Sequence, residues 1–334
     1  MHLPDNSHRS SQKGARKDAN AERALRTRPS QAKTNIVSLA ARIWRERWMY
    51  LFILPGFVYF VVFRYLPLLG NIIAFQDYSP FLGFRSPFVG LANFRALFTD
   101  PDVGVALGNT LAISVLQLIF FFPAPILLAL LLNSMVSEPA KRLMQSVLYL
   151  PHFISWVIII ALWQQLFGGA GFLNQFLRNG GHGTINIMTN PGFFKPLVVL
   201  QLIWKETGWG TIIILAALTR IDVSLYEAAA MDGAGGWRRL WHVTLPGIRG
   251  VIVLLLILRL ATILSTGFEQ IFLQRNAVGP RAAEVLDTFT YFRGIQGGDW
   301  GFSAAVGLVK GVVAAILVFA ANRVAKTFGG EGAF

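Results

Sequence analysis

Five ionisable residues lie inside long apolar stretches of the sequence, at Lys205, Glu206, Arg259, Glu269 and Lys310. Charges are costly in a nonpolar environment, so they usually pair with other groups or face a polar cavity. We expect some of them to line a cavity that binds a polar solute. A purely structural role, in which they only hold helices together, remains the alternative for each, and Arg259 fits that alternative best.

Aromatic and amide side chains accompany these charges. Trp204 and Trp209 lie on either side of the first charged pair, and Gln270 follows Glu269. Aromatic faces with polar partners suit a sugar, whose C–H face stacks while its hydroxyls form hydrogen bonds. Since three of the five charges are cations and two are anions, we also predict a net positive interior, which would favour acidic oligosaccharides.

No motif in the sequence predicts catalysis. The chain has no G-x-x-x-x-G-K-[ST] phosphate loop, no H-E-x-x-H zinc motif and no G-x-S-x-G nucleophile elbow. It also has no cysteine, which excludes disulfides and thiolate metal sites. We therefore expect no catalytic residue, no metal site and no cofactor in this chain, and any energy for its work must come from another protein.

The composition is that of an integral membrane protein. Of 334 residues, 54% are hydrophobic and only 14% are charged, against about 25% charged in a soluble domain. About 20 apolar residues cross a bilayer as a helix, which predicts an all-α fold with six transmembrane helices. The expected spans are Met49–Phe63 (extending toward Phe75), Leu107–Leu132, Val147–Phe167, Leu197–Thr219, Val251–Leu273 and Ser303–Asn322.

The basic residues predict the orientation of these spans. The net charge is +13, and 11 Lys and Arg lie in residues 1–48, a polar segment ahead of the expected transmembrane domain of residues 49–334. With six spans, both termini lie on one side, and the positive-inside rule places that side in the cytoplasm. We expect residues 1–48 to be a disordered cytoplasmic tail. Because membrane orientation accounts for the basic residues, we do not expect nucleic acid as a partner.

The polar loop of residues 220–249 would then face the cytoplasm. Ser224 and Glu227 match a capping box that opens a short helix, and Asp232-Gly233 predicts the turn that ends it. We expect a second short helix from Trp237, ended by Pro246. The amphipathic pair could dock another protein or lie on the membrane surface, and the residue pattern alone leaves both open.

The loop resembles the EAA motif of permease subunits in bacterial ABC importers. The matching residues, which we take as the ATPase-coupling site, are Glu227, Ala228, Ala229, Asp232, Gly233, Leu245 and Pro246. Val243 stands where the motif usually has Ile. The resemblance implies a type I permease fold, in which this loop is the coupling helix that sits in a cleft of a cytoplasmic ATPase subunit.

Further motifs resemble the carbohydrate-uptake branch of this family, above all permeases for polygalacturonan and alginate oligosaccharides. They are RYLP at 64–67, FQDYSP at 75–80, YLPHFISW at 149–156 and the C-terminal FGGEGAF. The resemblance implies a bacterial inner-membrane subunit that pairs with a second permease, two copies of an ATPase and an extracytoplasmic solute-binding protein, and that translocates an oligosaccharide by alternating access.

Three alternatives remain open from the sequence. The chain could be a permease for another small solute such as glycerol phosphate, because the EAA motif does not recognise substrate. It could be an ion-coupled secondary transporter with Glu206 and Glu269 as proton sites, although no internal repeat is evident. It could also be a membrane scaffold without a transport pathway.

Overall fold

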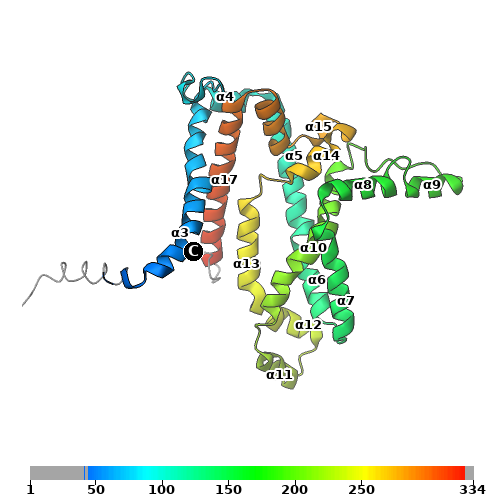
Figure 1. Ribbon diagram of the computed structural model, residues 1–334. Helices are drawn as coiled ribbons and strands as arrows, with labels where there is room; N and C mark the ends of the chain where they lie inside the picture. The colour runs from blue at the N-terminus through cyan, green and yellow to red at the C-terminus, as the bar shows by residue number, and fades with distance from the viewer. Residues whose placement is uncertain (1–40, 42–43, 328–334) are drawn as a thin grey trace, which may run out of the picture. The chain divides into compact units, whose positions relative to one another are not determined.

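The computed structural model describes residue 41 and residues 44–327 (Figure 1). The predicted tail of residues 1–48 therefore lies almost entirely outside the described residues. Within them the fold is helical, and the only sheet-type pairing is an isolated antiparallel bridge between Gln76 and Phe88. The chain forms two compact units, Met1–Gly70 and Asn71–Phe334.

The helices follow one another with short connections. Their bounds are α3 Arg47–Phe60, η1 Val61–Tyr65, η2 Leu66–Phe75, η3 Gly83–Arg85, α4 Ala92–Thr99, α5 Pro101–Leu116, η4 Gln117–Phe121, α6 Pro123–Asn133, α7 Glu138–Tyr149, η5 Leu150–Phe153, α8 Trp156–Phe167, α9 Phe172–Asn179, α10 Phe194–Leu218, α11 Val223–Met231, α12 Gly236–Arg239, η6 Leu240–Thr244, α13 Leu245–Ala261, α14 Phe268–Val278, α15 Pro280–Ala283, α16 Leu286–Thr290, η7 Tyr291–Gln296 and α17 Trp300–Thr327. The η elements are π-helical or 3₁₀ turns.

Six helical stretches of the described chain are long and apolar enough to cross a membrane, which confirms the predicted fold class. They are Arg47–Phe75, Pro101–Asn133, Trp156–Asn179, Phe194–Leu218, Gly236–Ala261 and Trp300–Thr327. Several continue through a π turn, as where η4 joins α5 to α6 ahead of Pro123. A π turn accommodates the amide that proline lacks without ending the helix.

Two of the predicted spans have the wrong bounds. The stretch Val147–Phe167 is not one helix, because α7 ends at Tyr149 and η5 separates it from α8. The stretch Val251–Leu273 is broken as well, since α13 ends at Ala261 and α14 begins only after Gly267, which has a φ of +98°. Both breaks fall where polar or helix-breaking residues interrupt the apolar sequence, at Pro151, His152 and Ser155 and at Thr262, Ser265, Thr266 and Gly267, which a count of apolar residues over whole spans did not resolve.

The helix α10 is the centre of the larger unit. Its buried residues recur every three or four positions, at Phe194, Leu197, Val198, Gln201, Lys205, Gly208, Thr211 and Ile214. They pack in turn against α5, α8 and α14, and then against α6 and α13. Close approach is possible at Gly208, where an added Cβ would lie 2.0 Å from the backbone oxygen of Leu148 in α7.

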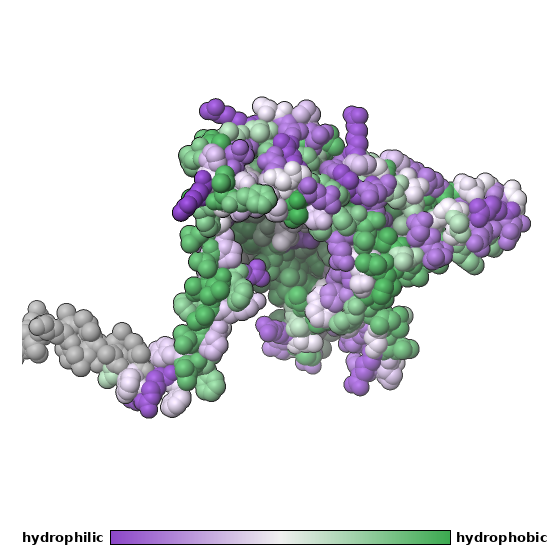
Figure 2. Space-filling model, turned by 45° about the horizontal axis from the view of Figure 1, so that its top comes forward, coloured by the Kyte–Doolittle hydropathy of each residue, from purple (hydrophilic) through white to green (hydrophobic). Residues whose placement is uncertain are grey.

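The sides of the long helices are apolar and exposed. Phe52, Leu69 and Phe319 are each at least 70% accessible, and Figure 2 shows hydrophobic residues along the helices with polar residues gathered at the ends. Exposed apolar surface of this extent is incompatible with water and requires lipid or protein around it.

Candidate functional site

The first short helix of the 220–249 loop is capped by Asp222. The carboxylate of Asp222 accepts a hydrogen bond of 2.9 Å from the backbone N–H of Ser224. The predicted capping box of Ser224 and Glu227 is therefore wrong, because Ser224 already lies in the second helical position of α11. Asp222 has the extended backbone that an N-cap requires.

The helix α11 ends as predicted, in a left-handed turn at Gly233, whose φ is +72°. The N–H of Gly233 donates to Ala230 O (3.0 Å) and the N–H of Ala234 donates to Ala229 O (2.9 Å). These two bonds form a Schellman motif, in which glycine at this position avoids the steric cost of a Cβ. Ala229, the second alanine of the EAA-type motif, thus accepts a hydrogen bond in the turn that Gly233 makes possible. Asp232 is the C-cap of α11.

The second short helix does not end at Pro246. The chain runs from α12 through the π turn η6 into α13 as one helical stretch, with Pro246 in the first turn of α13. Tyr226 of α11 and Thr244 of η6 join the two arms of the loop through their hydroxyls, 3.1 Å apart. Leu245 and the buried Ile248 then anchor the loop on α6 and α10.

The loop presents a polar surface with isolated large apolar side chains. Glu227 and Ala228 are exposed on α11, and the side chains of Met231 and Trp237 are 89% and 77% accessible. Figure 1 shows that α11 projects beyond the ends of α10 and α13. A rigid, capped projection with exposed aromatic side chains suits docking into a protein groove.

Lys205 lies at the break between α7 and α8 rather than in open space. The ammonium group donates hydrogen bonds to the backbone oxygens of His152 (2.6 Å) and Ile154 (2.8 Å), and weakly to Pro151 (3.4 Å). Its side chain is 7% accessible and lies 3.5 Å from Glu206. The carbonyl groups freed where the helix breaks are therefore satisfied by a cation from α10.

Glu206 and Trp209 meet His152 on the accessible side of the same break. His152 Nδ1 donates to Glu206 Oε2 over 2.7 Å. The imidazole stacks on the Trp209 ring, with centroids 4.4 Å apart and planes 5° apart, and Phe153 meets Trp209 edge-on. Glu206 and His152 are about one-quarter accessible, so the cluster combines aromatic surface with a reachable carboxylate.

The other predicted pathway residues have separate partners. Arg259 donates to Gln117 and lies over the Phe121 ring, beside a mainly apolar cavity of about 270 Å³. Lys310 pairs with Asp287. That carboxylate was not counted among the five charges and offsets one of the three cations, so the net positive interior stays a prediction.

The remaining three candidates differ in burial. Gln270 is buried, where its amide donates to Val198 O and to Gln201 Oε1, each over 2.9 Å. Glu269 is exposed and makes no polar contact within the described chain, and Trp204 is 40% accessible on α10. The structure therefore brings together only Lys205, Glu206 and Trp209 of the residues predicted for the pathway.

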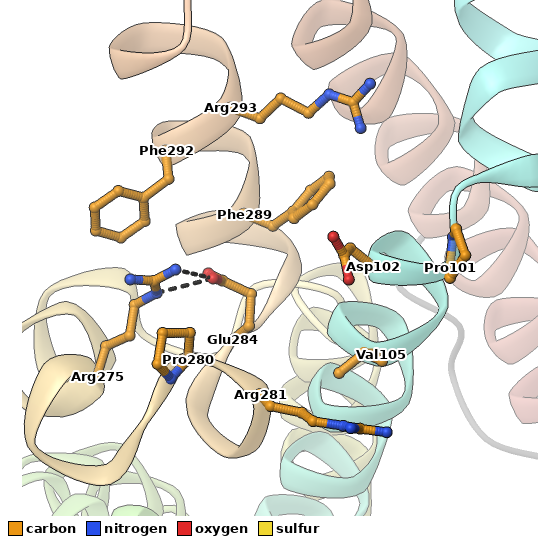
Figure 3. A pocket seen from close by; sticks show the side chains of 10 residues that line it. All are labelled: Pro101, Asp102, Val105, Arg275, Pro280, Arg281, Glu284, Phe289, Phe292 and Arg293. Carbon is orange, nitrogen blue, oxygen red and sulfur yellow. Dashed lines mark hydrogen bonds and ion pairs between the residues drawn. The ribbon is translucent and has the colours of Figure 1, made fainter.

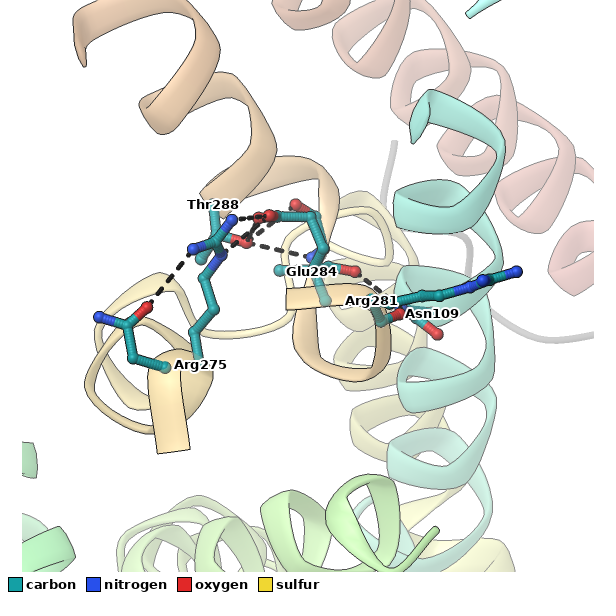
Figure 4. A network of polar contacts seen from close by, with 7 residues as sticks. Asn109, Arg275, Arg281, Glu284 and Thr288 are labelled. Atoms are coloured by element: carbon teal, nitrogen blue, oxygen red, sulfur yellow. Dashed lines mark hydrogen bonds and ion pairs between the residues drawn. The ribbon is translucent and has the colours of Figure 1, made fainter. Parts of the chain in front are cut away.

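A larger cavity, of about 770 Å³, lies between the start of α5 and the segment from α14 to η7 (Figure 3). Two of its three arginines are already paired, whereas the exposed Arg281 has no ion pair within the described chain. Arg275 binds Glu284 and covers the Phe292 ring at 3.9 Å, and Arg293 binds Asp100 and Asp299. Glu284 also accepts a hydrogen bond from the hydroxyl of Thr288. Asn109 of α5 donates to the backbone oxygen of Glu284 over 2.9 Å (Figure 4).

Sequence reasoning missed three residues that the structure brings to these sites. No role is predicted for any of them from the sequence, although His152 lies in the YLPHFISW motif. No local signal links His152 to Glu206 or Arg293 to Asp100, because these partners lie 54 and 193 positions apart. Arg275 and Glu284 are only nine positions apart, but no motif marks them as a pair.

Residues 121–329 match the family of the binding-protein-dependent transport system inner membrane component. The chain belongs to this family. It is 46% identical over 300 residues to Protein LplB of Bacillus subtilis (strain 168), covering 89% of this chain and 94% of LplB. It is 48% identical over 298 residues to the polygalacturonan/rhamnogalacturonan transport system permease protein YteP of the same organism, covering 89% and 93%.

The fold is also that of a solved member. A chain of the bacterial alginate ABC transporter, in complex with its alginate pentasaccharide-bound periplasmic protein, superimposes with a TM-score of 0.80 and 35% identity over 87% of this chain and 98% of that chain. As a member of the binding-protein-dependent family, this chain is a multi-pass membrane permease component of an importer that works with partner proteins.

Proposed function

We propose that this chain is the translocation subunit of an ATP-driven importer for oligosaccharides. The cluster of Glu206, His152 and Trp209 at the α7–α8 break carries the proposal. An aromatic face beside a carboxylate matches the mixed apolar and hydroxyl surface of a sugar. The similarity to YteP and to the alginate transporter supports the same substrate class.

The charges of the site favour a sugar over a phosphate ester. Relatives at 34% identity are sn-glycerol-3-phosphate permeases, so a phosphate substrate is the closest rival. Lys205 and Lys310 are each bound to protein acceptors, and Glu206 would repel the double charge of a phosphate ester more strongly than the single carboxylate of a uronic-acid residue. The cluster offers hydrogen-bond acceptors and aromatic surface, which is what hydroxyl groups and C–H faces need.

The residues on α11 and α12 give the subunit its link to an energy source. We assign ATP hydrolysis to two copies of a cytoplasmic ATPase, which the exposed surface around Glu227, Met231 and Trp237 would contact. This chain itself would need no cofactor. Both termini would face the cytoplasm of a bacterium, by the excess of basic residues on that side.

The remaining partners complete the pathway. A second permease would supply the other half of the translocation channel, and an extracytoplasmic solute-binding protein would deliver the sugar. When the ATPases close, the loop moves with them, and α10 and α13, which begin or end at this loop, transmit the displacement to the break held by Lys205.

Purification of the tagged chain from mild detergent tests the assembly. We expect a P-loop ATPase and a second permease to co-purify, and oligosaccharide uptake by proteoliposomes to stop when the catalytic carboxylate of that ATPase is removed. Isolation of the chain alone, with uptake driven by a proton gradient, would establish a secondary transporter instead.

The substitution Trp209→Ala tests the sugar site. Loss of one stacking face is worth roughly 0.5–1.5 kcal/mol, so we expect uptake of the oligosaccharide to fall roughly 2- to 10-fold. The control is Leu200→Ala, a similarly exposed position on the same helix, which should leave uptake unchanged. Equal loss in both variants would remove Trp209 from the pathway.

A further inference from the structure

The segment Trp156–Asn179 is long and apolar enough to cross a membrane, yet it is not a straight helix. α8 ends at Phe167, four residues form a turn, and α9 begins at Phe172. Figure 1 shows that both helices run across the direction of α7 and α10, at the end of the unit opposite α11. We call α8, the turn and α9 together the arm.

Specific hydrogen bonds and close glycine contacts hold the turn in the arm. Asn174 is fully buried and donates to Gly168 O and Ile185 O, both over 2.9 Å, while its own oxygen accepts from the N–H of Ile185 over 2.7 Å. Gly168 and Gly171 leave no room for a side chain, because an added Cβ would lie 2.4 Å and 2.8 Å from backbone oxygens. The bend of the arm is therefore held by local contacts.

The helix α8 has one face packed and one apolar face without a protein partner in the described chain. Ile159 and Trp163 are buried against Met188 and Leu197. The outward face carries exposed apolar side chains at Val157, Ile158, Ala161, Leu162 and Leu166, with the exposed Gln165 among them.

The helix α9 is amphipathic. Phe172 and Phe176, one turn apart, are each 68% exposed. Gln175 and Arg178 lie on the other face, where they donate to Ala170 O (2.9 Å) and Gly169 O (3.3 Å). Aromatic residues opposite a basic residue are the composition of helices that lie in the interface of a bilayer.

We propose that the arm lies in the membrane interface at the end of the spans opposite α11, with its apolar face against the acyl chains of that leaflet. Lipid is the occupant because exposed large apolar side chains recur along the whole segment, at Val147, Leu150 and Phe153, then along α8 and at Phe172 and Phe176. The same surface type covers the sides of the spans (Figure 2). Arg178 would then meet the headgroups.

The third membrane crossing of the chain would then be made by α7 and η5 instead of Trp156–Asn179. These 16 residues, Glu138–Phe153, measure about 24 Å at 1.5 Å per residue, short of a typical hydrocarbon core of about 30 Å. The first turns carry Glu138, Lys141 and Arg142, so the apolar part of this crossing is shorter still. A local thinning of the bilayer accommodates a short span, and an arm embedded in one leaflet would stabilise such thinning. The inference rests on membrane insertion alone, so it stands or falls independently of the proposed substrate.

Depth measurements on single-cysteine variants test the arm. The chain contains no native cysteine, so a nitroxide label reports one position. We would label Phe172→Cys and Phe176→Cys, with Gln175→Cys as the matched control on the opposite face, in the assembled importer in proteoliposomes. Collision rates with oxygen, which concentrates in lipid, and with a water-soluble nickel chelate give the depth of each label.

We expect oxygen collisions to dominate at both phenylalanine positions, at similar shallow depth, and nickel collisions to dominate at Gln175. A depth that passes through the bilayer centre between Ile158 and Phe176 would show a spanning helix and overturn the proposal. Exclusion of both reagents at Phe172 and Phe176 would show a protein partner there, which also overturns it. Labels at Leu162 and Leu166 give the same test if a variant on α9 fails to assemble.

Discussion

The α11–α12 loop and the α7–α8 break are stabilised in opposite ways. In the loop, the capping bonds join residues two to five positions apart, such as Asp222 with Ser224 and Ala229 with Ala234. At the break, the three bonds of Lys205 reach 51 to 54 positions along the chain. The loop thus holds its shape by local bonds, whereas the break, although Pro151 and the Ser155 N-cap favour it locally, also depends on α10.

This difference suits the two regions to different tasks. A unit stabilised by local bonds keeps its shape when it is pushed, so the loop can pass on a displacement. A break held by a neighbouring helix changes when that helix shifts, because the carbonyl groups of His152 and Ile154 depend on a cation from α10. Substitutions in the two regions should therefore fail in different ways.

The largest effect is expected for Lys205→Met. The variant leaves three backbone oxygens and Glu206 without their buried cation, which should cost about 3–5 kcal/mol. We expect a large fall in the thermal stability of the purified complex together with loss of uptake. The control Lys326→Met alters an exposed lysine near the end of α17 and should change neither. Unaltered stability in Lys205→Met would show that water can replace the ammonium group.

The second effect, smaller and of a different kind, is expected for Gly233→Ala. An alanine in the left-handed region costs about 1–2 kcal/mol, which the short helix α11 can relieve only by opening its Schellman turn. We expect uptake and ATP hydrolysis to become uncoupled while the thermal stability of the complex stays near that of the parent.

The control is Gly235→Ala in the same loop. Neither glycine has an atom within 4 Å of an added Cβ, but Gly235 has a φ of −66° that alanine tolerates. Equal uncoupling in both variants would attribute the effect to the surface of the loop and not to its turn.

The same contrast explains what the sequence could predict. Helical spans and the Gly233 turn depend on neighbouring residues, so composition and local pattern were sufficient for them. The breaks after Tyr149 and Ala261 contain only a few polar residues beside Pro151 and Gly267, and their geometry also depends on contacts with other helices. The ion pair of Lys310 with Asp287 joins a span to a segment that the sequence placed outside the spans.

The wrong N-cap predicted for α11 has a different cause from the missed helix breaks. Asp222 and Ser224 are both good N-cap residues two positions apart, and the later one had the glutamate that completes a capping box. Only the extended backbone at Asp222 decides between them. Local pattern therefore located the helix but not its first residue.

The smallest effect is expected at Asp222 itself. Hydrogen bonds from the backbone and side chain of Ser224 lower the pKa of the Asp222 carboxyl below its ordinary value of 3.8. Because the pKa is lowered in the folded loop, the cap's contribution is present above the ordinary value and is lost only as the pH falls through the lower, folded value.

Uptake by the parent should therefore show no change attributable to Asp222 between about pH 5 and 8, well above the ordinary carboxyl pKa. Asp222→Asn keeps the acceptor and should retain most of the uptake, whereas Asp222→Ala removes it and should lose more. The ratio of Asp222→Asn to parent uptake should stay constant across this pH range. A ratio that rises as the pH falls would mean that Asp222 titrates there, and that the cap is not closed while the loop works.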